Sequence, residues 1–520
     1  MSEVIATNQT ILVVGGGISG MTAALEAAEC GKQVLLVEKN PSVGGRVSQL
    51  YKYFPKLCHP KCGLEINLRR MKANRNLRVL TMTEVTQIEG DAGNYSVTLK
   101  TSPRYINENC TSCGACAEAV EGEFDDDYNY GLKKRKAAYL PFNQAYPERY
   151  VLDPRAIGTP DADKAKAACK YGAVDLDMQE QESTVTVGAI IWATGWKPYD
   201  AGKIQPYGYD RFANVITSVE FERMLDPFGP TGGKILRPSD GKEAKDVAFI
   251  QCAGSRDLNH LKHCSRICCM ATLKQTTYLR EQFGDDAKGT VYYIDIRAID
   301  RIDDFYQKVQ EDPNITFTKS KVASITEDRE TGNPVLHGVD TEGYHRYSNP
   351  HDLVVLAIGQ TPDLAVDSGL AVNRMGRIRL DEPGYATSRP GVFAAGDAAT
   401  GPSLVVDAIG GGRRAARSIH QFVMGQPVVA DPLELQKDLI SETLFDHVMG
   451  IVKTQRAPMP ELPVAERIQS FVEADLVLSE EAARGESNRC LSCCLTCYNP
   501  DGAACEIGVI KDPSREPEVA

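Results

Sequence analysis

The 520-residue chain lacks three features that would place it in a membrane, outside the cell or on a nucleic acid. No apolar run approaches the roughly 18 residues that a bilayer span needs. The first ten residues lack the basic and apolar regions of a secretory signal. With a net charge of −12, the chain lacks the positive excess that phosphate backbones attract. We therefore expect a cytoplasmic protein with no direct membrane span and no nucleic-acid partner.

Cysteine, in contrast, is abundant, with 16 residues. In a reducing compartment, closely spaced cysteines are typical of metal ligands or redox groups rather than of disulfides. All but Cys30, Cys58 and Cys62 fall into three groups. The first group is Cys110, Cys113, Cys116 and the distant Cys169; the second is Cys252, Cys264, Cys268 and Cys269; the third is Cys490, Cys493, Cys494, Cys497 and Cys505.

Residues 11–38 have the order strand, glycine-rich turn, helix, strand of a dinucleotide-binding unit. Gly15 and Gly17 allow a tight turn and a close approach of the backbone to a pyrophosphate, and Gly20 lets the helix pack on the strand. The N–H groups at the start of the helix are free to bind the phosphates. Glu38 ends the second strand, where an acid binds a ribose hydroxyl. The unit predicts dinucleotide binding.

Three later segments indicate that the dinucleotide is FAD. They are 44–46 (Gly-Gly-Arg), 188–195 and 391–397, and they resemble, in the same order, motifs of FAD-dependent disulfide-reductase-like enzymes. In those enzymes the late aspartate contacts the ribityl chain of the flavin. The resemblance implies that FAD is bound by Gly15, Gly17, Gly20, Glu38, Lys39, Gly45, Arg46, Thr194, Gly195, Gly396 and Asp397.

A second Rossmann-like unit begins with the strand 245–250. The turn that follows, 251–256, keeps a single glycine, Gly254, where a phosphate-binding loop would have three. Cysteine stands in this turn instead. The sequence therefore argues against nicotinamide binding at this place.

The first cysteine group has the Cys-x₂-Cys-x₂-Cys spacing of a ferredoxin, which holds three irons of a four-iron cluster. Cys169 stands in a segment similar to the one that supplies the fourth ferredoxin ligand. Residues 117–168 are polar, and we expect them to loop out of the small module. A zinc site or buried free thiols are the alternatives.

In the second group, Cys264, Cys268 and Cys269 are predicted to lie on one helix that runs to about Gln282. Cys264 and Cys268 would then share a face, Cys269 would point about 100° away, and Cys252 would have to complete the site. By spacing alone, small buried hydrophobic residues are as good an interpretation as a metal cluster.

The third group repeats Cys-x₂-Cys and adds Cys505, which favours an iron–sulfur cluster over zinc and leaves five thiols for four positions. Before it, Ser479 is a good N-cap for a short helix over 479–484. Cys58 and Cys62 follow the first glycine-rich unit. They could form a redox dithiol, part of a cluster site shared with another chain, or a structural pair.

Several long stretches resemble the A-subunit family of heterodisulfide reductases, the HdrA-like flavoproteins, from about residue 10 to 425. The resemblance is carried by 229–243, by the turn 251–257 with 264–270, and by 131–142. It implies four-iron clusters on the cysteine groups, and it implies that Lys274, the candidate catalytic residue, lies near the N5 edge of the flavin. The stretch 53–66 is closer to the branch formed by the A-subunits of quinone-interacting membrane-bound oxidoreductases.

Together these features predict an α/β protein with an FAD-dependent, thioredoxin-reductase-like fold of two dinucleotide-binding domains and an inserted ferredoxin-like module. The expected domains are FAD-binding parts at 8–103, 179–244 and 346–425, the ferredoxin-like insertion at 104–178, the degenerate second Rossmann-like domain at 245–345 and a C-terminal extension at 426–520.

The expected function is electron transfer between FAD and two or three four-iron clusters, within a heterodisulfide-reductase-like complex. Its partners would be iron–sulfur or membrane subunits, in a homo- or hetero-oligomer. The alternatives are a quinone-linked oxidoreductase subunit, a self-sufficient NAD(P)H-dependent flavin oxidoreductase, and a binding or regulatory module whose clusters are structural or sense redox state.

Overall fold

The computed structural model describes residues 7–298, 302–364, 369–381, 384–429 and 455–489. The chain splits into two compact units, Met1–Asp431 and Pro432–Ala520. The second unit contains the short helices α9 (Val464–Arg467) and α10 (Glu480–Asn488). The Ser479 hydroxyl accepts a hydrogen bond from the Ala482 N–H at 3.2 Å, which confirms the predicted N-cap.

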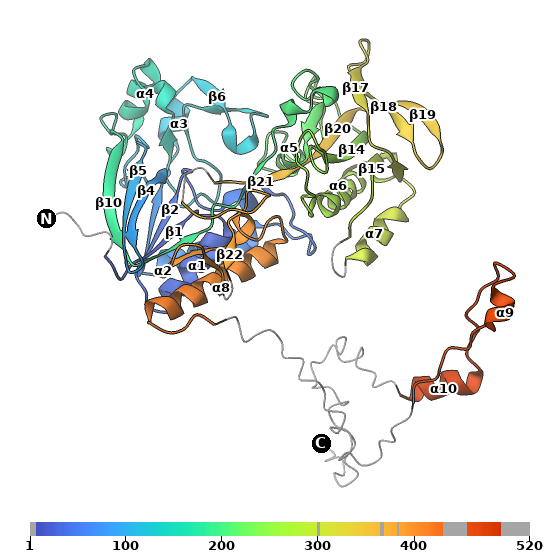
Figure 1. Ribbon diagram of the computed structural model, residues 1–520. Coiled ribbons are helices and arrows are strands. Elements are labelled where there is room, and N and C mark those ends of the chain that lie inside the picture. Colours follow the sequence, from blue (N-terminus) through green and yellow to red (C-terminus); the bar gives the residue numbers. More distant parts are fainter. Residues whose placement is uncertain (1–6, 299–301, 365–368, 382–383, 430–454, 490–520) are drawn as a thin grey trace, which may run out of the picture. The chain divides into compact units, whose positions relative to one another are not determined.

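The first sheet of the larger unit has seven strands in the order β22-β23-β24-β11-β1-β2-β3 (Figure 1). Its central strands are parallel, and β1 lies between β2 and β11 because an unbroken apolar strand needs neighbours on both edges and cover on both faces. The strands are β1 (Ile11–Val14), β2 (Val34–Glu38), β3 (Leu77–Thr81), β11 (Ala189–Trp192), β22 (Leu380–Asp381), β23 (Ala386–Thr387) and β24 (Val392–Ala394).

Alternate residues of these strands face two different layers. Ile11 and Val13 pack with helices on one face, whereas Leu12 and Val14 pack with an antiparallel sheet on the other. The helices are α1 (Ile18–Glu29), α2 (Lys61–Ala73) and α8 (Val405–Val423), and the antiparallel sheet is β4 (Thr83–Asp91), β5 (Asn94–Thr101) and β10 (Gln181–Val187).

A small module with its own core is inserted between β5 and β10. It contains α3 (Ala115–Ala119), α4 (Pro160–Ala168) and the strand pairs β6 (Glu123–Asp125) with β7 (Lys134–Lys136) and β8 (Ala138–Tyr139) with β9 (Val151–Leu152). The expectation that 117–168 loops out is wrong for its middle part. Tyr128 and Phe142 line the same cavity as the glycine-rich turn, because their stacked rings pack back onto the first sheet's loops.

The second sheet is parallel, in the order β13-β20-β14-β15-β16. Helices lie along it, and an antiparallel sheet packs on its other side. The parallel strands are β13 (Val215–Thr217), β14 (Asp246–Ala253), β15 (Lys288–Tyr293), β16 (Ile315–Lys319) and β20 (Leu353–Ile358). The helices are α5 (Ser218–Leu225), α6 (Cys268–Phe283) and α7 (Asp303–Gln310), and the antiparallel strands are β17 (Ser324–Glu327), β18 (Pro334–Asp340) and β19 (His345–Pro350).

Two parallel sheets, each covered on both faces, confirm the predicted α/β class with two dinucleotide-binding-type domains. The second sheet takes strands from outside the predicted range 245–345, since β13 precedes it and β20 follows it. These two short apolar strands carry no motif that marks their sheet. The two domains are linked by the strand pair β12 (Trp196–Pro198) and β21 (Gln360–Pro362), which continue β11 and β20.

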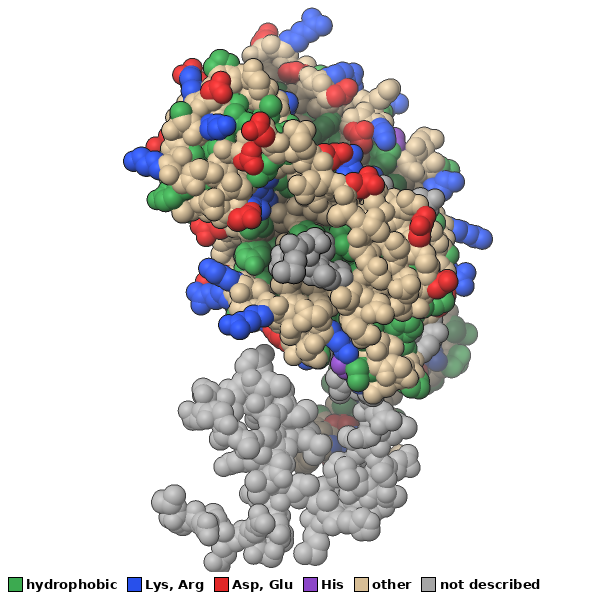
Figure 2. All heavy atoms as spheres, turned by 90° about the vertical axis from the view of Figure 1, so that its left-hand side faces the viewer, with side chains coloured by type: hydrophobic (Ala, Val, Ile, Leu, Met, Phe, Trp, Pro, Cys, Tyr) green, Lys and Arg blue, Asp and Glu red, His purple; other side chains and the backbone are tan. Residues whose placement is uncertain are grey.

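Charges of both signs are interspersed over the described part of the face in Figure 2. This mixture is the ordinary solvated surface rather than a single-sign docking face. Among the described helices, none combines the length and apolar character that a membrane crossing requires.

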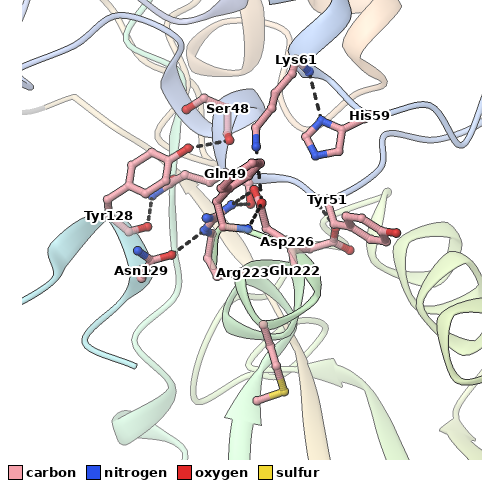
Figure 3. A network of polar contacts seen from close by, with 12 residues as sticks. Ser48, Gln49, Tyr51, His59, Lys61, Tyr128, Asn129, Glu222, Arg223 and Asp226 are labelled. Atoms are coloured by element: carbon pink, nitrogen blue, oxygen red, sulfur yellow. Dashed lines mark hydrogen bonds and ion pairs between the residues drawn. The ribbon is translucent and has the colours of Figure 1, made fainter. Parts of the chain in front are cut away.

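A buried polar network joins the two domains (Figure 3). Arg223 of α5 donates from Nη1 to the carbonyl of Gln49 at 3.2 Å and to Asp226 Oδ2 at 2.9 Å, and from Nε to Asn129 Oδ1 at 2.9 Å. Lys61 Nζ lies 3.4 Å from Asp226 Oδ1. Three segments far apart in the sequence therefore meet on two ion-paired side chains, Arg223 and Asp226, that are each 2% exposed.

We expect Arg223→Met to lower the free energy of unfolding by about 3–5 kcal/mol, because Asp226 and Asn129 lose a partner where water cannot replace it. Burial raises the pKa of Asp226, but the Phe228 N–H and the Arg223 charge outweigh burial and hold it below 3.8. The loss should therefore be present above pH 3.8 and shrink as the pH falls below that value.

Denaturant unfolding followed by tryptophan fluorescence measures the difference. The control is Arg211→Met, since the Arg211 side chain is 56% exposed beside Asp210 and its removal should cost about 0.5 kcal/mol or less. Equal losses for the two variants would contradict the role of the buried network.

Candidate cofactor cavity and cysteine groups

A cavity of 630 Å³ opens at the carboxyl ends of the first sheet's strands, a size typical of cofactor sites. It is also lined by the ferredoxin-like module and by helices α5 and α6 of the second domain. Ten of the eleven predicted FAD ligands line it; Gly20 alone does not. The ten are Gly15, Gly17, Glu38, Lys39, Gly45, Arg46, Thr194, Gly195, Gly396 and Asp397.

The three glycines of the first turn have different surroundings. A Cβ on Gly20 would lie 1.9 Å from the carbonyl oxygen of Gly15, so Gly20 is required for the packing of α1 on β1. Gly15 has φ +104°, which a side chain rarely allows. A Cβ on Gly17 would meet only Gly45 Cα, at 4.0 Å. Gly17 therefore leaves open space at the start of α1, where N–H groups bind phosphate.

Glu38 is buried at the end of β2 and holds the turn together. Its Oε2 accepts a hydrogen bond from the Gly16 N–H at 2.6 Å, and its Oε1 accepts bonds from the backbone and side chain of Asn40. Burial raises the pKa of Glu38, and the three bonds only partly offset this. Lys39 points elsewhere, since its Nζ pairs with Asp363 at 2.5 Å.

At the other end of the cavity, Asp397 and Thr194 have unmet polar capacity. Burial raises the pKa of Asp397 to about 7, although its carboxylate accepts a hydrogen bond from the Ser403 hydroxyl at 3.2 Å. The Thr194 hydroxyl is buried with no partner among the described residues. Arg46 lies between the rings of Tyr130 and Trp196 at 5.8 and 5.7 Å. A ligand with hydroxyls fits this lining, because buried donors and acceptors need partners.

The candidate catalytic residue, Lys274, lines the cavity from α6. Its Nζ lies 2.9 Å from Glu222 Oε1 and donates to the carbonyl of Lys52 at 2.6 Å. Sequence reasoning found Lys274 by resemblance but missed Glu222, which stands on α5 and has no motif around it. It also missed Tyr128 and Phe142 of the insertion, although 131–142 was one of the stretches that carried the resemblance.

The first cysteine group is gathered in the ferredoxin-like module. Cys110, Cys116 and Cys169 pack against the module's core, and Cys113 is exposed. Left-handed backbone at Ser112 and Gly114 coils the loop around the three clustered cysteines. Burial raises the pKa of the Cys169 thiol, but N–H groups of residues 171–174 outweigh it and lower the pKa. Such donors stabilise a thiolate, the form that binds iron.

The second group lies at the carboxyl end of β14 and the start of α6. The prediction that Cys264 shares this helix is wrong: α6 begins at Cys268, because Arg266 has left-handed backbone with φ 59°. The four thiols nonetheless interact. Burial raises the pKa of Cys268, and the charges of Cys269, Cys252 and Cys264 raise it further.

The turn after β14 has no open phosphate loop. Cys252 has left-handed backbone with φ 56°. A Cβ on Gly254 would lie 2.7 Å from the Tyr199 ring, so the ring fills the space beside the single glycine. Within the described ranges, no three His, Cys, Asp or Glu side chains converge closely enough for a single metal ion.

Cys58 and Cys62 are both exposed, Cys62 on the first turn of α2. Nearby Tyr53 and Phe54 line the cavity. The structure leaves the three interpretations of this pair open. The third cysteine group, Cys490 to Cys505, lies outside the described residues, and its role stays a prediction.

Comparison with known proteins agrees with this site. Residues 10–87 match the family model described as FAD dependent oxidoreductase, and residues 290–412 match pyridine nucleotide-disulphide oxidoreductase. Among solved structures, thioredoxin reductases from T. acidophilum and Lactococcus lactis cover 79% and 80% of this chain and 98% and 99% of their own, with 15% and 14% identity and TM-scores of 0.45 and 0.46.

The similar curated proteins are longer than the aligned region. The second of the iron–sulfur A-subunits of CoB–CoM heterodisulfide reductase from Methanopyrus kandleri is 36% identical over 82% of this chain and 66% of its own length. The corresponding protein from Methanocaldococcus jannaschii is 39% identical over 80% of this chain and 64% of its own. The chain therefore spans somewhat less than two thirds of these relatives. It belongs to the family formed by the A-subunits of heterodisulfide reductases.

Proposed function

We propose that the chain is an electron-transfer subunit that binds FAD in the 630 Å³ cavity and iron–sulfur clusters on its cysteine groups. One observation carries the proposal. Helix α6 has Cys268 and Cys269 in its first turn and Lys274 on the cavity wall. At 1.5 Å per residue, Cys268 and Lys274 are about 9 Å apart along the helix axis, within reach for electron transfer between their cofactors.

The cavity residues suit FAD. The turn from Gly15 to Gly20 and the first N–H groups of α1 would hold the pyrophosphate, and Glu38 would exchange a bond to Asn40 for a ribose hydroxyl. Thr194 and Asp397 have the unmet capacity that the hydroxyls of the flavin chain require. When bound, FAD supplies interconversion of two-electron and one-electron transfer.

The cysteine groups suit four-iron clusters. Cys110, Cys113, Cys116 and Cys169 would hold one cluster within the inserted module, and the second group would hold another beside the cavity. The third group is predicted to hold a further one. These positions form a path from the flavin to the module surface, where Cys113 is exposed.

The relatives are named as subunits of heterodisulfide reductases. We propose that this chain likewise acts inside a larger redox complex, on the cytoplasmic side, and passes electrons to iron–sulfur or membrane subunits. The closed turn at Gly254 supports this over a self-sufficient NAD(P)H-dependent reductase, which needs an open phosphate loop.

The Gly17→Val variant should bind FAD at least about 100-fold more weakly, because its side chain would fill the space that the pyrophosphate requires. The fold should persist, since Gly17 has extended backbone with φ −72° and ψ −179°. Fluorescence titration of the flavin-free protein with FAD measures the affinity.

The matched control is Gly63→Val, on the exposed side of α2, where an added Cβ meets no atom within 4 Å. Its FAD affinity should equal that of the wild type. Unchanged affinity of the Gly17 variant would contradict FAD binding at this turn.

Cys116→Ala and Cys269→Ala should each remove about four irons and four acid-labile sulfides per chain from anaerobically purified protein. Cys30→Ala should remove none, because Cys30 is an exposed residue at the end of α1, outside the three groups. Iron and sulfide assays with EPR of the reduced protein provide the readout. Wild-type protein without sulfide, or unchanged iron in both variants, would refute the cluster assignment.

A further inference from the structure

A buried acid, Glu222, lines the cavity beside Lys274. Its Oε1 lies 2.9 Å from Lys274 Nζ and accepts a hydrogen bond from Gln275 Nε2 at 2.8 Å. Its Oε2 accepts a bond from the Tyr51 N–H at 3.0 Å. Donors from both domains therefore fix the orientation of this carboxylate.

Lys274 and Glu222 form an almost fully buried pair, with side chains 4% and 3% exposed. The ammonium of Lys274 also donates to the carbonyl of Lys52, which orients it without cancelling its charge. Because Glu222 supplies the opposite charge at contact distance, the cavity meets a nearly neutral pair instead of a lone cation. In a buried site such a difference acts strongly on any charge that develops nearby.

We propose that Glu222 is a positioning residue that sets the reduction potential of the flavin, by holding the Lys274 ammonium at the cavity wall and offsetting its charge. The inference rests on the proposed function, which places FAD in this cavity. Electrons added to the flavin bring negative charge, which a lone lysine would stabilise strongly. The pair moderates that effect and leaves the reduced flavin able to return electrons to the clusters.

The test is the two-electron potential of bound FAD, measured by spectroelectrochemistry on the full-length, cluster-loaded protein. Glu222→Gln keeps the shape and should raise the potential, with the ratio of reduced to oxidised flavin shifted at least about tenfold, or 30 mV. Lys274→Gln should lower it. The Glu222→Gln/Lys274→Gln double variant should return to within threefold of the wild-type ratio, because neutral groups then replace a neutral pair.

Two further variants separate charge from general disturbance. Glu222→Asp keeps the charge and should restore a potential near that of the wild type. Glu220→Gln removes another buried acid of α5, one that pairs with Thr217 and Tyr209 and does not line the cavity, so the potential should not move.

An unchanged or lowered potential in Glu222→Gln would overturn the proposal, and so would a double variant that behaves like Lys274→Gln alone. An equal shift in Glu220→Gln would also overturn it. Failure of the wild type to bind FAD is a different result, which refutes the proposed function before any potential is measured.

Discussion

The contact of α5 and α6 with the loop after the glycine-rich turn is the constraint on which the rest of the site depends. Arg223 and Lys274 donate to carbonyls of Gln49 and Lys52, and Glu222 accepts from the Tyr51 N–H between them. Domains joined only by two strands are free to move unless their interface opposes it. Here three buried charges grip one short segment, so the cavity keeps walls from both domains.

The ferredoxin-like module takes part in the same constraint. Asn129 accepts a hydrogen bond from Arg223, and the Tyr128 hydroxyl donates to the carbonyl of Ser48 at 2.6 Å. The module is therefore tied both to α5 and to the loop that α5 grips. Its first cysteine group is held on a fixed support relative to the cavity, as electron transfer over a set distance requires.

Local patterns predicted what local physics determines. Buried apolar strands, glycine spacing and cysteine spacing identified the two sheets, the dinucleotide turn and the cysteine groups. The start of α6 was missed because a single left-handed residue, Arg266, interrupts a helix-like run. Glu222 and Arg223 were missed for another reason. Their partners Tyr51 and Gln49 lie 171 and 174 residues away, and no periodicity reveals a contact that only the packed domains create.

The position of the second cysteine group follows from the topology of the parallel sheet. Ligands of such sheets bind beyond the carboxyl ends of the strands, and β14 ends there in the turn that a nicotinamide would need. Tyr199 closes the space beside Gly254, and Cys252 begins a group that continues onto α6. The arrangement that aims a nicotinamide at a flavin thus aims cysteines at the same cavity. A change of ligand, with the scaffold kept, is sufficient to replace hydride transfer by single-electron transfer.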